Sequence, residues 1–422
     1  MTVTHVHSID TAPDQVRWPD VARVPSGVTA RFGAPIAAHL FRRAASRLDV
    51  RVELPDGTNL GSSDPRAPLM RVHRPAAFAR RVAADGLIGF GEAFMAGDWD
   101  APDPAAALTP FAASAASLVP RALQVLRPLV LPGQPAAERN SAANTRSNIS
   151  RHYDLSNDLF ALFLDDTMTY SSALFDEVPA RWDTLEAAQH RKIDRLLDAA
   201  GVGAGTRLLE IGTGWGELAV RAARRGAHVR SVTLSSEQRE LARGRVAAAG
   251  YADRVDIDLL DYRSVRGEYD AVVSVEMIEA VGFEYWPTYF ETIDRVLVPG
   301  GRVALQAITM PDARMRATRG TYTWIHKYIF PGGLLPSTEA LEQAAAHTAL
   351  RTEGRLGFGS DYADTLRLWR ERFTTNADAV AGLGFDATFR RMWEFYLAYS
   401  EAGFRSGYLD VQQITLTKGG AS

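Results

Sequence analysis

Five short apolar segments, rich in β-branched residues, recur from residue 206 onward with helical segments between them. They cover residues 206–212 (TRLLEIG), 228–235 (HVRSVTLS), 254–261 (RVDIDLLD), 269–276 (YDAVVSVE) and 301–309 (GRVALQAIT). Such runs are typical of buried strands, and their alternation with helices indicates a mostly parallel sheet that is covered on both faces. We therefore predict a doubly wound α/β fold for this region.

The turn after the first of these strands is rich in glycine. Gly212, Gly214 and Gly216 stand in the sequence LLEIGTGWGELA (208–219), between a strand and the start of a helix. Glycine allows a tight turn and lets a ligand approach the main chain closely. Because open α/β sheets bind ligands at the carboxyl ends of their strands, this turn is the candidate cofactor loop.

The residues around the loop favour S-adenosylmethionine over a dinucleotide. A dinucleotide fingerprint needs a glycine where Glu217 stands, and an acidic residue at the end of the second strand, which here ends as TLS (233–235). A Walker-type phosphate loop needs Gly-Lys-Ser/Thr, which this turn does not contain. Glu210 before the turn and Asp261 at the end of the third strand fit S-adenosylmethionine better. A glycine turn that binds no ligand is the alternative.

Composition excludes several classes of protein. The 422-residue chain contains no cysteine, which excludes disulfides, thiolate metal sites and cysteine nucleophiles. Its net charge of −3 gives no general attraction for nucleic acid, and its histidines lack metal-ligand spacing. No apolar run is long enough to cross a bilayer, and the first residues lack the order of a signal peptide. We therefore expect a cytoplasmic protein with no metal and no nucleic-acid partner.

A chain of this length is too long for one compact core and predicts at least two domains. We predict a disordered N-terminus over residues 1–16, an N-terminal α+β domain over 17–132, a linker over 133–146 and the α/β domain over 147–422. The linker is predicted because its residues are small, polar and rich in proline and glycine.

Several further motifs occur in the order found in one enzyme family. They are GEAFMAGDWD (91–100), SNISRHYDLSNDLFALFLDDTMTYSSALF (147–175), VTLSSEQ (232–238), SVEMIEAVGFEYW (274–286), KYIFPGGLLPS (327–337), GSDYADTLRLW (359–369) and RMWEFYLAYSEAGF (391–404). Together with the glycine loop they resemble the cyclopropane-fatty-acyl-phospholipid synthases and mycolic acid cyclopropane synthases. The resemblance implies a class I methyltransferase that binds S-adenosylmethionine and acts on the cis double bond of a lipid acyl chain. It makes the smaller N-terminal domain a candidate lipid-binding domain.

The resemblance also implies which residues contact the cofactor. Tyr170 and Ser171 match the pair that contacts its methionine part, and Thr233 lies among positions near the ribose and the amino-acid portion. The complete predicted cofactor site, including the residues taken from the loop itself, is Tyr170, Ser171, Glu210, Gly212, Gly214, Gly216, Thr233, Leu234, Gln238 and Asp261.

The implied chemistry needs a dry, aromatic pocket. An alkene is a poor nucleophile, so the sulfonium methyl must be held close to it, and water must be kept from the carbocation that follows. Aromatic ring faces stabilise such a cation. The candidate lining residues are Tyr153, Phe160, Tyr322, Trp324, Tyr328, Phe330, Tyr362 and Trp369.

Loss of a proton from the carbocation needs a base. In the family that the chain resembles, a bicarbonate serves, held by a cysteine, a glutamate, a histidine and a tyrosine. Glu279 matches the glutamate and Tyr362 the tyrosine, whereas Ser172 stands at the cysteine position and Gln306 at the histidine position. Serine and glutamine can still donate hydrogen bonds to an anion, so an altered bicarbonate site is one hypothesis. Direct proton removal by Glu279, with its pKa raised by burial, is the other.

The carbocation has two exits. Proton loss from the added methyl closes a cyclopropane, whereas a preceding hydride shift gives an exocyclic methylene that a partner reductase can convert to a methyl branch. Ser172 and Gln306 favour the second exit, and residues 305–337 resemble the actinobacterial branch associated with 10-methyl (tuberculostearic-type) fatty acids. Because the chain shows no dinucleotide loop, the reductase would be separate. The alternative function is an inactive lipid-binding protein that keeps a methyltransferase core.

The expected partners are the acyl chains of membrane phospholipids. A helix rich in alanine and leucine, with Arg121 and Arg127, is of a kind that can lie at the membrane surface, and a helix packed within the domain is the commoner alternative. We therefore expect peripheral association with the inner face of the membrane, and self-association as a dimer.

Overall fold

The computed structural model of the chain describes residues 12–114 and 156–419. Contacts divide the chain into two compact units, and each is considered by itself. Unit 1 contains residues 1–133, 321–329 and 373–408, and unit 2 contains residues 134–320, 330–372 and 409–422.

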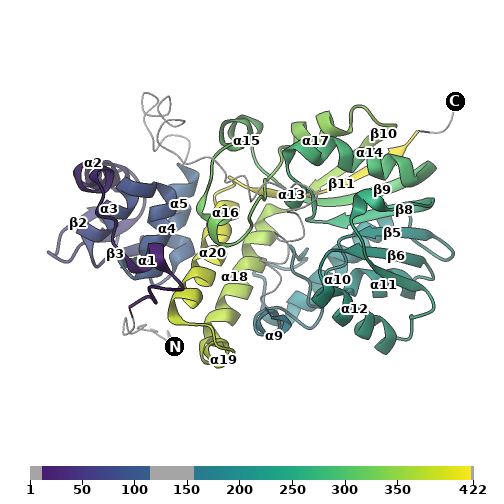
Figure 1. Ribbon diagram of the computed structural model, residues 1–422, viewed down its shortest axis with the longest axis horizontal. Coiled ribbons are helices and arrows are strands. Elements are labelled where there is room, and N and C mark those ends of the chain that lie inside the picture. The colour runs from purple at the N-terminus through teal and green to yellow at the C-terminus, as the bar shows by residue number, and fades with distance from the viewer. Residues whose placement is uncertain (1–11, 115–155, 420–422) are drawn as a thin grey trace. The chain divides into compact units, whose positions relative to one another are not determined.

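A seven-stranded sheet forms the centre of unit 2, in the order β10-β11-β9-β8-β5-β6-β7 (Figure 1). Its strands are β5 (Arg207–Ile211), β6 (His228–Thr233), β7 (Val255–Leu259), β8 (Tyr269–Val275), β9 (Leu297–Thr309), β10 (Leu350–Gly357) and β11 (Asp410–Lys418). The first five are the predicted strands, and they pair in parallel. The predicted α/β class is thus confirmed. The antiparallel strands β10 and β11, which extend the sheet beyond β9, were not predicted.

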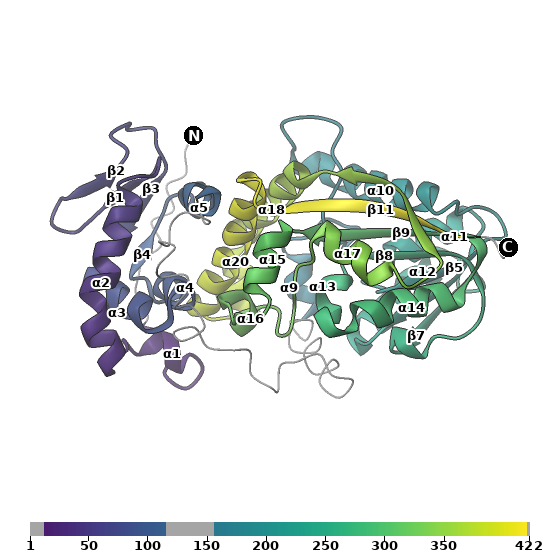
Figure 2. The same ribbon diagram turned by 90° about the horizontal axis from the view of Figure 1, so that it is seen from above.

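Helices cover both faces of this sheet (Figures 1 and 2). Leu208 of β5 packs in one cluster with residues of α10, α11 and α12, whereas the adjacent Leu209 packs in another with residues of α14 and α17. Adjacent residues face opposite sides of a strand, so an apolar run such as β5 buries both faces. The helices of this unit are α9 (Asn157–Ala161), α10 (Trp182–Ala199), α11 (Glu217–Arg224), α12 (Ser236–Ala248), α13 (Ile278–Val281), α14 (Trp286–Val296), α15 (Asp312–Thr318), α17 (Thr338–Ala345) and α18 (Gly359–Thr375), with short 3-10 turns η2 (Tyr262–Ser264) and η3 (Phe283–Tyr285).

Unit 1 combines a small sheet, in the order β2-β1-β3-β4, with several helices. The strands are β1 (Arg51–Glu53), β2 (Asn59–Gly61), β3 (Leu69–Val72) and β4 (Trp99–Asp100). The helices are α1 (Pro19–Ala22), α2 (Val28–Ala45), α3 (Pro75–Asp85), α4 (Leu87–Ala96), α5 (Pro104–Ala113), α16 (Trp324–Tyr328), α19 (Ala377–Gly382) and α20 (Ala387–Arg405). The mixture of strands and helices agrees with the α+β character expected of the N-terminal region.

The predicted uninterrupted second domain, 147–422, needs correction, because α16 and α20 complete the core of unit 1. The ring of Phe395 in α20 lies 5.4 Å from that of Phe94 and 4.8 Å from that of Trp324 in α16. Lys327 Nζ donates to Glu92 Oε1 at 2.6 Å, and Tyr328 donates to the same oxygen at 2.7 Å. Both late segments therefore supply aromatic and charged partners that α4 lacks on its own.

Other predictions concern segments at the edge of the described residues. Of the predicted disordered stretch 1–16, residues 12–16 are described, and the Asp14 carboxylate accepts hydrogen bonds from the N–H groups of Val16 and Arg17. The linker 133–146, the helix carrying Arg121 and Arg127, and Tyr153 lie outside the described residues. No helix within residues 12–114 and 156–419 is long and apolar enough to cross a bilayer.

Candidate active site

The site is built where the strand order of unit 2 reverses. From β5 the chain proceeds through β6 to β7 on one side, and then returns to place β8 and β9 on the other side of β5. In open α/β sheets, ligands bind at the carboxyl ends of the strands that flank such a switch point. The glycine loop follows β5 and the segment 276–279 follows β8, so both lie at this point.

Each glycine of the loop adopts a positive φ, but for different reasons. A Cβ atom on Gly212 would lie 2.5 Å from the side chain of Met277, and one on Gly216 would lie 3.0 Å from Ala242. Gly214 has φ +53°, and nothing lies within 4 Å of the position of its Cβ. The loop therefore leaves open space at Gly214, which fits the close approach of a cofactor to the main chain.

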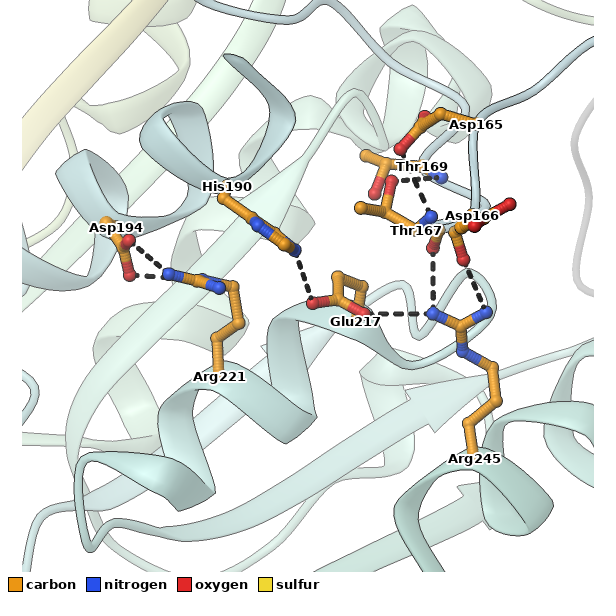
Figure 3. A network of polar contacts seen from close by, with 9 residues as sticks. All are labelled: Asp165, Asp166, Thr167, Thr169, His190, Asp194, Glu217, Arg221 and Arg245. Atoms are coloured by element: carbon orange, nitrogen blue, oxygen red, sulfur yellow. Dashed lines mark hydrogen bonds and ion pairs between the residues drawn. The ribbon is translucent and has the colours of Figure 1, made fainter. Parts of the chain in front are cut away.

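A polar network fastens the helix after the loop to the segment before Tyr170 (Figure 3). Glu217, the first residue of α11, accepts from His190 Nε2 at 3.0 Å and from Arg245 at 2.9 Å. Arg245 also donates to the carbonyl oxygens of Asp166 and Thr167, at 3.0 and 3.2 Å. Glu217 stands where a dinucleotide fingerprint would need a glycine. Its contacts join the helices α10, α11 and α12 around the loop.

The predicted pair Tyr170 and Ser171 is held by α10. Lys192, whose side chain is fully buried, donates to Ser171 Oγ at 2.6 Å, and Gln189 donates to the Ser171 carbonyl at 2.9 Å. Burial lowers the pKa of Lys192 to about 8. No sequence motif singled out Lys192, because a lysine on an amphipathic helix usually faces solvent.

The remaining predicted cofactor residues lie at the ends of the first three strands. Buried Glu210 accepts from Ser231 Oγ at 2.5 Å, and burial raises the pKa of its carboxyl to about 8. Thr233 donates to Gln238 Oε1 at 3.0 Å, and Leu234 beside it stays partly exposed. Asp261 caps η2 and pairs with Arg263. Their predicted contacts with a cofactor stay predictions.

An aromatic cluster lies beside the loop. Trp215 stands between Gly214 and Gly216 in the sequence. The ring of Phe160 lies 4.9 Å from that of Trp215 and 5.1 Å from that of Tyr170. Tyr170 lies 5.3 Å from Trp369, which lies 6.3 Å from Tyr362. Three of the predicted lining residues, Phe160, Tyr362 and Trp369, thus come together here. Tyr322, Trp324 and Tyr328 belong instead to unit 1.

Sequence reasoning missed the residue at the centre of the predicted base site. Glu276, directly after β8, accepts from the Ser172 N–H at 3.0 Å, from Gln306 Nε2 at 2.8 Å and from the Tyr362 hydroxyl at 2.6 Å. These donors are three of the four residues predicted to hold a bicarbonate. Ser172 uses its main-chain N–H, since its hydroxyl donates to the Ala173 carbonyl at 2.9 Å.

Glu279, the fourth predicted residue, is the second residue of the short helix α13. Its Oε1 accepts from the N–H of Ile308 at 2.5 Å, and its buried Oε2 has no hydrogen-bond partner among the described residues. Burial, and next the charge of Glu276, raise the pKa of Glu279 to about 8. Two interacting carboxyl groups therefore stand three residues apart in the sequence, and their spacing in EMIE is a signal that could have drawn attention to Glu276.

Comparison with known proteins assigns this arrangement to a family. The model of the mycolic acid cyclopropane synthetases matches residues 140–414. The chain belongs to this family. The tuberculostearic acid methyltransferase UfaA1 of Mycobacterium tuberculosis is 58% identical over 425 residues, which cover all of both chains. The cyclopropane-fatty-acyl-phospholipid synthase of Escherichia coli is 33% identical over 83% of this chain and 88% of its own length.

Solved structures support the family assignment. The cyclopropane synthase MmaA2 of Mycobacterium tuberculosis has a TM-score of 0.60 and 32% identity, covering 65% of this chain and 98% of its own. The mycolic acid cyclopropane synthase CmaA1, complexed with S-adenosylhomocysteine (SAH) and CTAB, has the same TM-score and 30% identity, covering 68% and 99%. The cyclopropane synthetase family is thus one of class I methyltransferases, and S-adenosylmethionine is its cofactor. The predictions of the family, the enzyme class and the cofactor are confirmed.

Proposed function

We propose that the protein methylates the cis double bond of an unsaturated acyl chain carried on a phospholipid, and that the product is a methylene-branched chain. The observation that carries the proposal is the contact between the cofactor loop and the carboxylate segment. Met277, between Glu276 and Glu279 in sequence, fills the space against Gly212. A group bound at the loop and a group able to accept a proton therefore belong to one site. The names of the relatives support a lipid substrate.

The loop side of the site positions the methyl donor. S-adenosylmethionine, when bound, supplies an electrophilic methyl on its sulfonium. Gly214 leaves room for it at the main chain, and Ser171, which the family resemblance assigns to its methionine part, is held by Lys192 and Gln189. Because these groups are already held by hydrogen bonds, little ordering is needed when the cofactor binds, which favours a near-attack geometry.

The aromatic cluster protects the reacting carbons. Phe160, Tyr170 and Trp369 offer ring faces and edges, and Phe160 and Trp369 are fully buried. Ring faces stabilise positive charge, and a lining without free water prevents hydration of the cation. Proton removal is assigned to the pair Glu276 and Glu279, the carboxyl groups that follow β8.

The relatives and the altered base site support a methylene product. The 58% identical relative is named for tuberculostearic acid, a 10-methyl fatty acid, and Gln306 replaces the expected histidine. A separate reductase would convert the methylene to a methyl branch, and the N-terminal domain would help to take up lipid at the membrane surface.

The purified full chain tests this proposal directly. It is incubated with S-adenosylmethionine and dioleoyl phospholipid vesicles, and the fatty acids are then identified by mass spectrometry. The expected product is a methylene-branched C19 chain. A ring-only product would overturn the branching assignment, and no methylated lipid in the presence of normal SAH binding would favour an inactive, lipid-binding core.

A further inference from the structure

The hydrogen bonds around Glu276 satisfy a single anion. Oε1 accepts from the Ser172 N–H and from Gln306 Nε2, and Oε2 accepts from the Tyr362 hydroxyl. The tyrosine hydroxyl and the main-chain N–H each have one proton to donate. Gln306 Nε2 has two, and the second points to the Ser172 carbonyl at 3.4 Å. These three groups have no donor capacity left for a second anion.

A hydrogen bond from Gln413 sets the orientation of the Gln306 side-chain amide. Gln413 Nε2 donates to Gln306 Oε1 at 3.1 Å, so the amide nitrogen of Gln306 is the atom that faces Glu276. Gln413 is itself held, because its Nε2 also donates to the Lys192 carbonyl at 3.1 Å and its Oε1 accepts from Arg195 at 2.5 Å. The two amides therefore fix Gln306 as a hydrogen-bond donor to Glu276. A neutral histidine at this position could donate only if its proton were on the ring nitrogen that faces Glu276.

The backbone of Glu276 adopts an unusual conformation. Its φ is +51°, a left-handed conformation that residues other than glycine rarely adopt and that strains the main chain. The main chain is held there by a hydrogen bond from its N–H to the Gln306 carbonyl at 2.7 Å. The strained backbone therefore directs the carboxylate toward the three donors.

Bicarbonate does not fit this arrangement. Ser172, Gln306 and Tyr362 are the positions at which the family resemblance places its ligands, and each already donates to Glu276. A second anion would also lie beside the Glu276 carboxylate, and like charges that close repel strongly in a buried site.

We propose that Glu276 is the built-in anion of this site and the base of the reaction, so that catalysis needs no bicarbonate. This inference rests on the proposed function. A C–H bond of the transferred methyl breaks, and its proton passes to a carboxylate oxygen of Glu276. Its electron pair forms the double bond to the neighbouring cationic carbon, after the hydride shift, and the proton later leaves to water.

The surrounding charges agree with this role. Burial raises the pKa of Glu276, and the neighbours that oppose this by favouring its charged form are Tyr362, Lys192, Gln306 and the Ser172 N–H. Burial, and next the charge of Glu276, raise the pKa of Glu279 beside it to about 8. Of the pair, Glu276 accepts from three donors, whereas Glu279 accepts from the Ile308 N–H with one oxygen only, so Glu276 is the carboxylate that the described residues stabilise as an anion.

The test compares Glu276→Gln, Glu276→Gly and the control Glu284→Gln, an exposed carboxylate of η3, with the unaltered protein. Methylated lipid is measured in buffer freed of carbon dioxide, and again with added bicarbonate or formate. SAH affinity is measured by calorimetry, and binding of ¹³C-bicarbonate by NMR. Glycine suits the positive φ, so Glu276→Gly opens the anion position without strain.

We expect the unaltered protein and Glu284→Gln to work equally with and without bicarbonate, and to bind none. Glu276→Gln should bind SAH normally and lose activity by at least about 100-fold, the usual contribution of a general base. Glu276→Gly should bind ¹³C-bicarbonate and regain activity with either anion.

Three results would overturn the inference: an unaltered protein that needs bicarbonate, a Glu276→Gln variant with normal turnover, or a Glu276→Gly variant that binds SAH but responds to neither anion. Methylated lipid that depends on bicarbonate would leave the proposed function intact, whereas no methylated lipid under any condition would refute the function itself.

Discussion

Replacing Gly214 by alanine should weaken cofactor binding with little damage to the fold. The φ of +53° is left-handed, where an alanine costs about 1–2 kcal/mol. Alanine also restricts the unfolded chain more than glycine does, and this offsets about 0.4–1 kcal/mol of the cost. Because nothing lies within 4 Å of the new Cβ, no steric clash is added, and the net loss of stability should be about 1 kcal/mol. For a unit of this size that lowers Tm by about 2–4 °C.

The effect on the cofactor should be larger. A methyl group placed where the cofactor approaches the main chain should weaken SAH binding at least tenfold, which corresponds to about 1.4 kcal/mol. Calorimetry with SAH measures this loss. The matched control is Gly250→Ala, because Gly250 also has a positive φ, +82°, and open space at its Cβ, but follows α12 at the other end of that helix from the loop.

The two variants should therefore lose the same stability, while Gly214→Ala alone loses affinity. An SAH dissociation constant within about twofold of the unaltered value in Gly214→Ala would refute this reasoning. So would an equal loss of affinity in Gly250→Ala.

Three further predictions concern the buried carboxyl groups and the two units. Burial raises the pKa of Glu210 from 4.5 to about 8, so between these values the folded state holds a proton that the unfolded state releases, and the free energy of unfolding should fall as pH rises. In urea unfolding between pH 5.5 and 8, Glu210→Gln should flatten this pH dependence. An unchanged slope would contradict the assignment. A Cβ on Gly91 would lie 2.5 Å from the Trp324 ring, so Gly91→Ala should destabilise unit 1 by about 1–3 kcal/mol in denaturant titrations, whereas Gly382→Ala, with open space, should not. Deleting residues 1–146 should uncover the aromatic face of α20 and give a protein that aggregates or binds the dye ANS; a soluble truncated chain with normal SAH affinity would show that unit 1 is dispensable for folding.

The parallel sheet could be predicted because each of its strands carries its own pattern. Leu208 and Leu209 need opposite faces covered, and such a run has few alternatives to a buried parallel strand. The division into units could not be predicted in the same way. The aromatic residues Trp324 and Phe395 indicate that α16 and α20 bury one face, but no local pattern states that the partner is α4, some 230 to 300 residues earlier.

The candidate site was predicted in its parts and missed at its centre. Ser172, Gln306 and Tyr362 could be located through their motifs, because each motif is local. Glu276 could not, because it continues an ordinary strand sequence and nothing in that sequence signals a positive φ. Its importance comes from donors on three separate segments, which only the folded chain brings together.

The return of the chain to unit 1 affects the order in which a newly made protein can assemble. Phe94 leaves the ribosome about 300 residues before Phe395, which at about 5–20 residues per second is a delay of about 15–60 s. During this time all five parallel strands of unit 2 are synthesised, whereas the aromatic cluster of unit 1 lacks α20. The first part of the chain to be made therefore completes its core only when translation is nearly finished, and its apolar surface must stay free of aggregation until then.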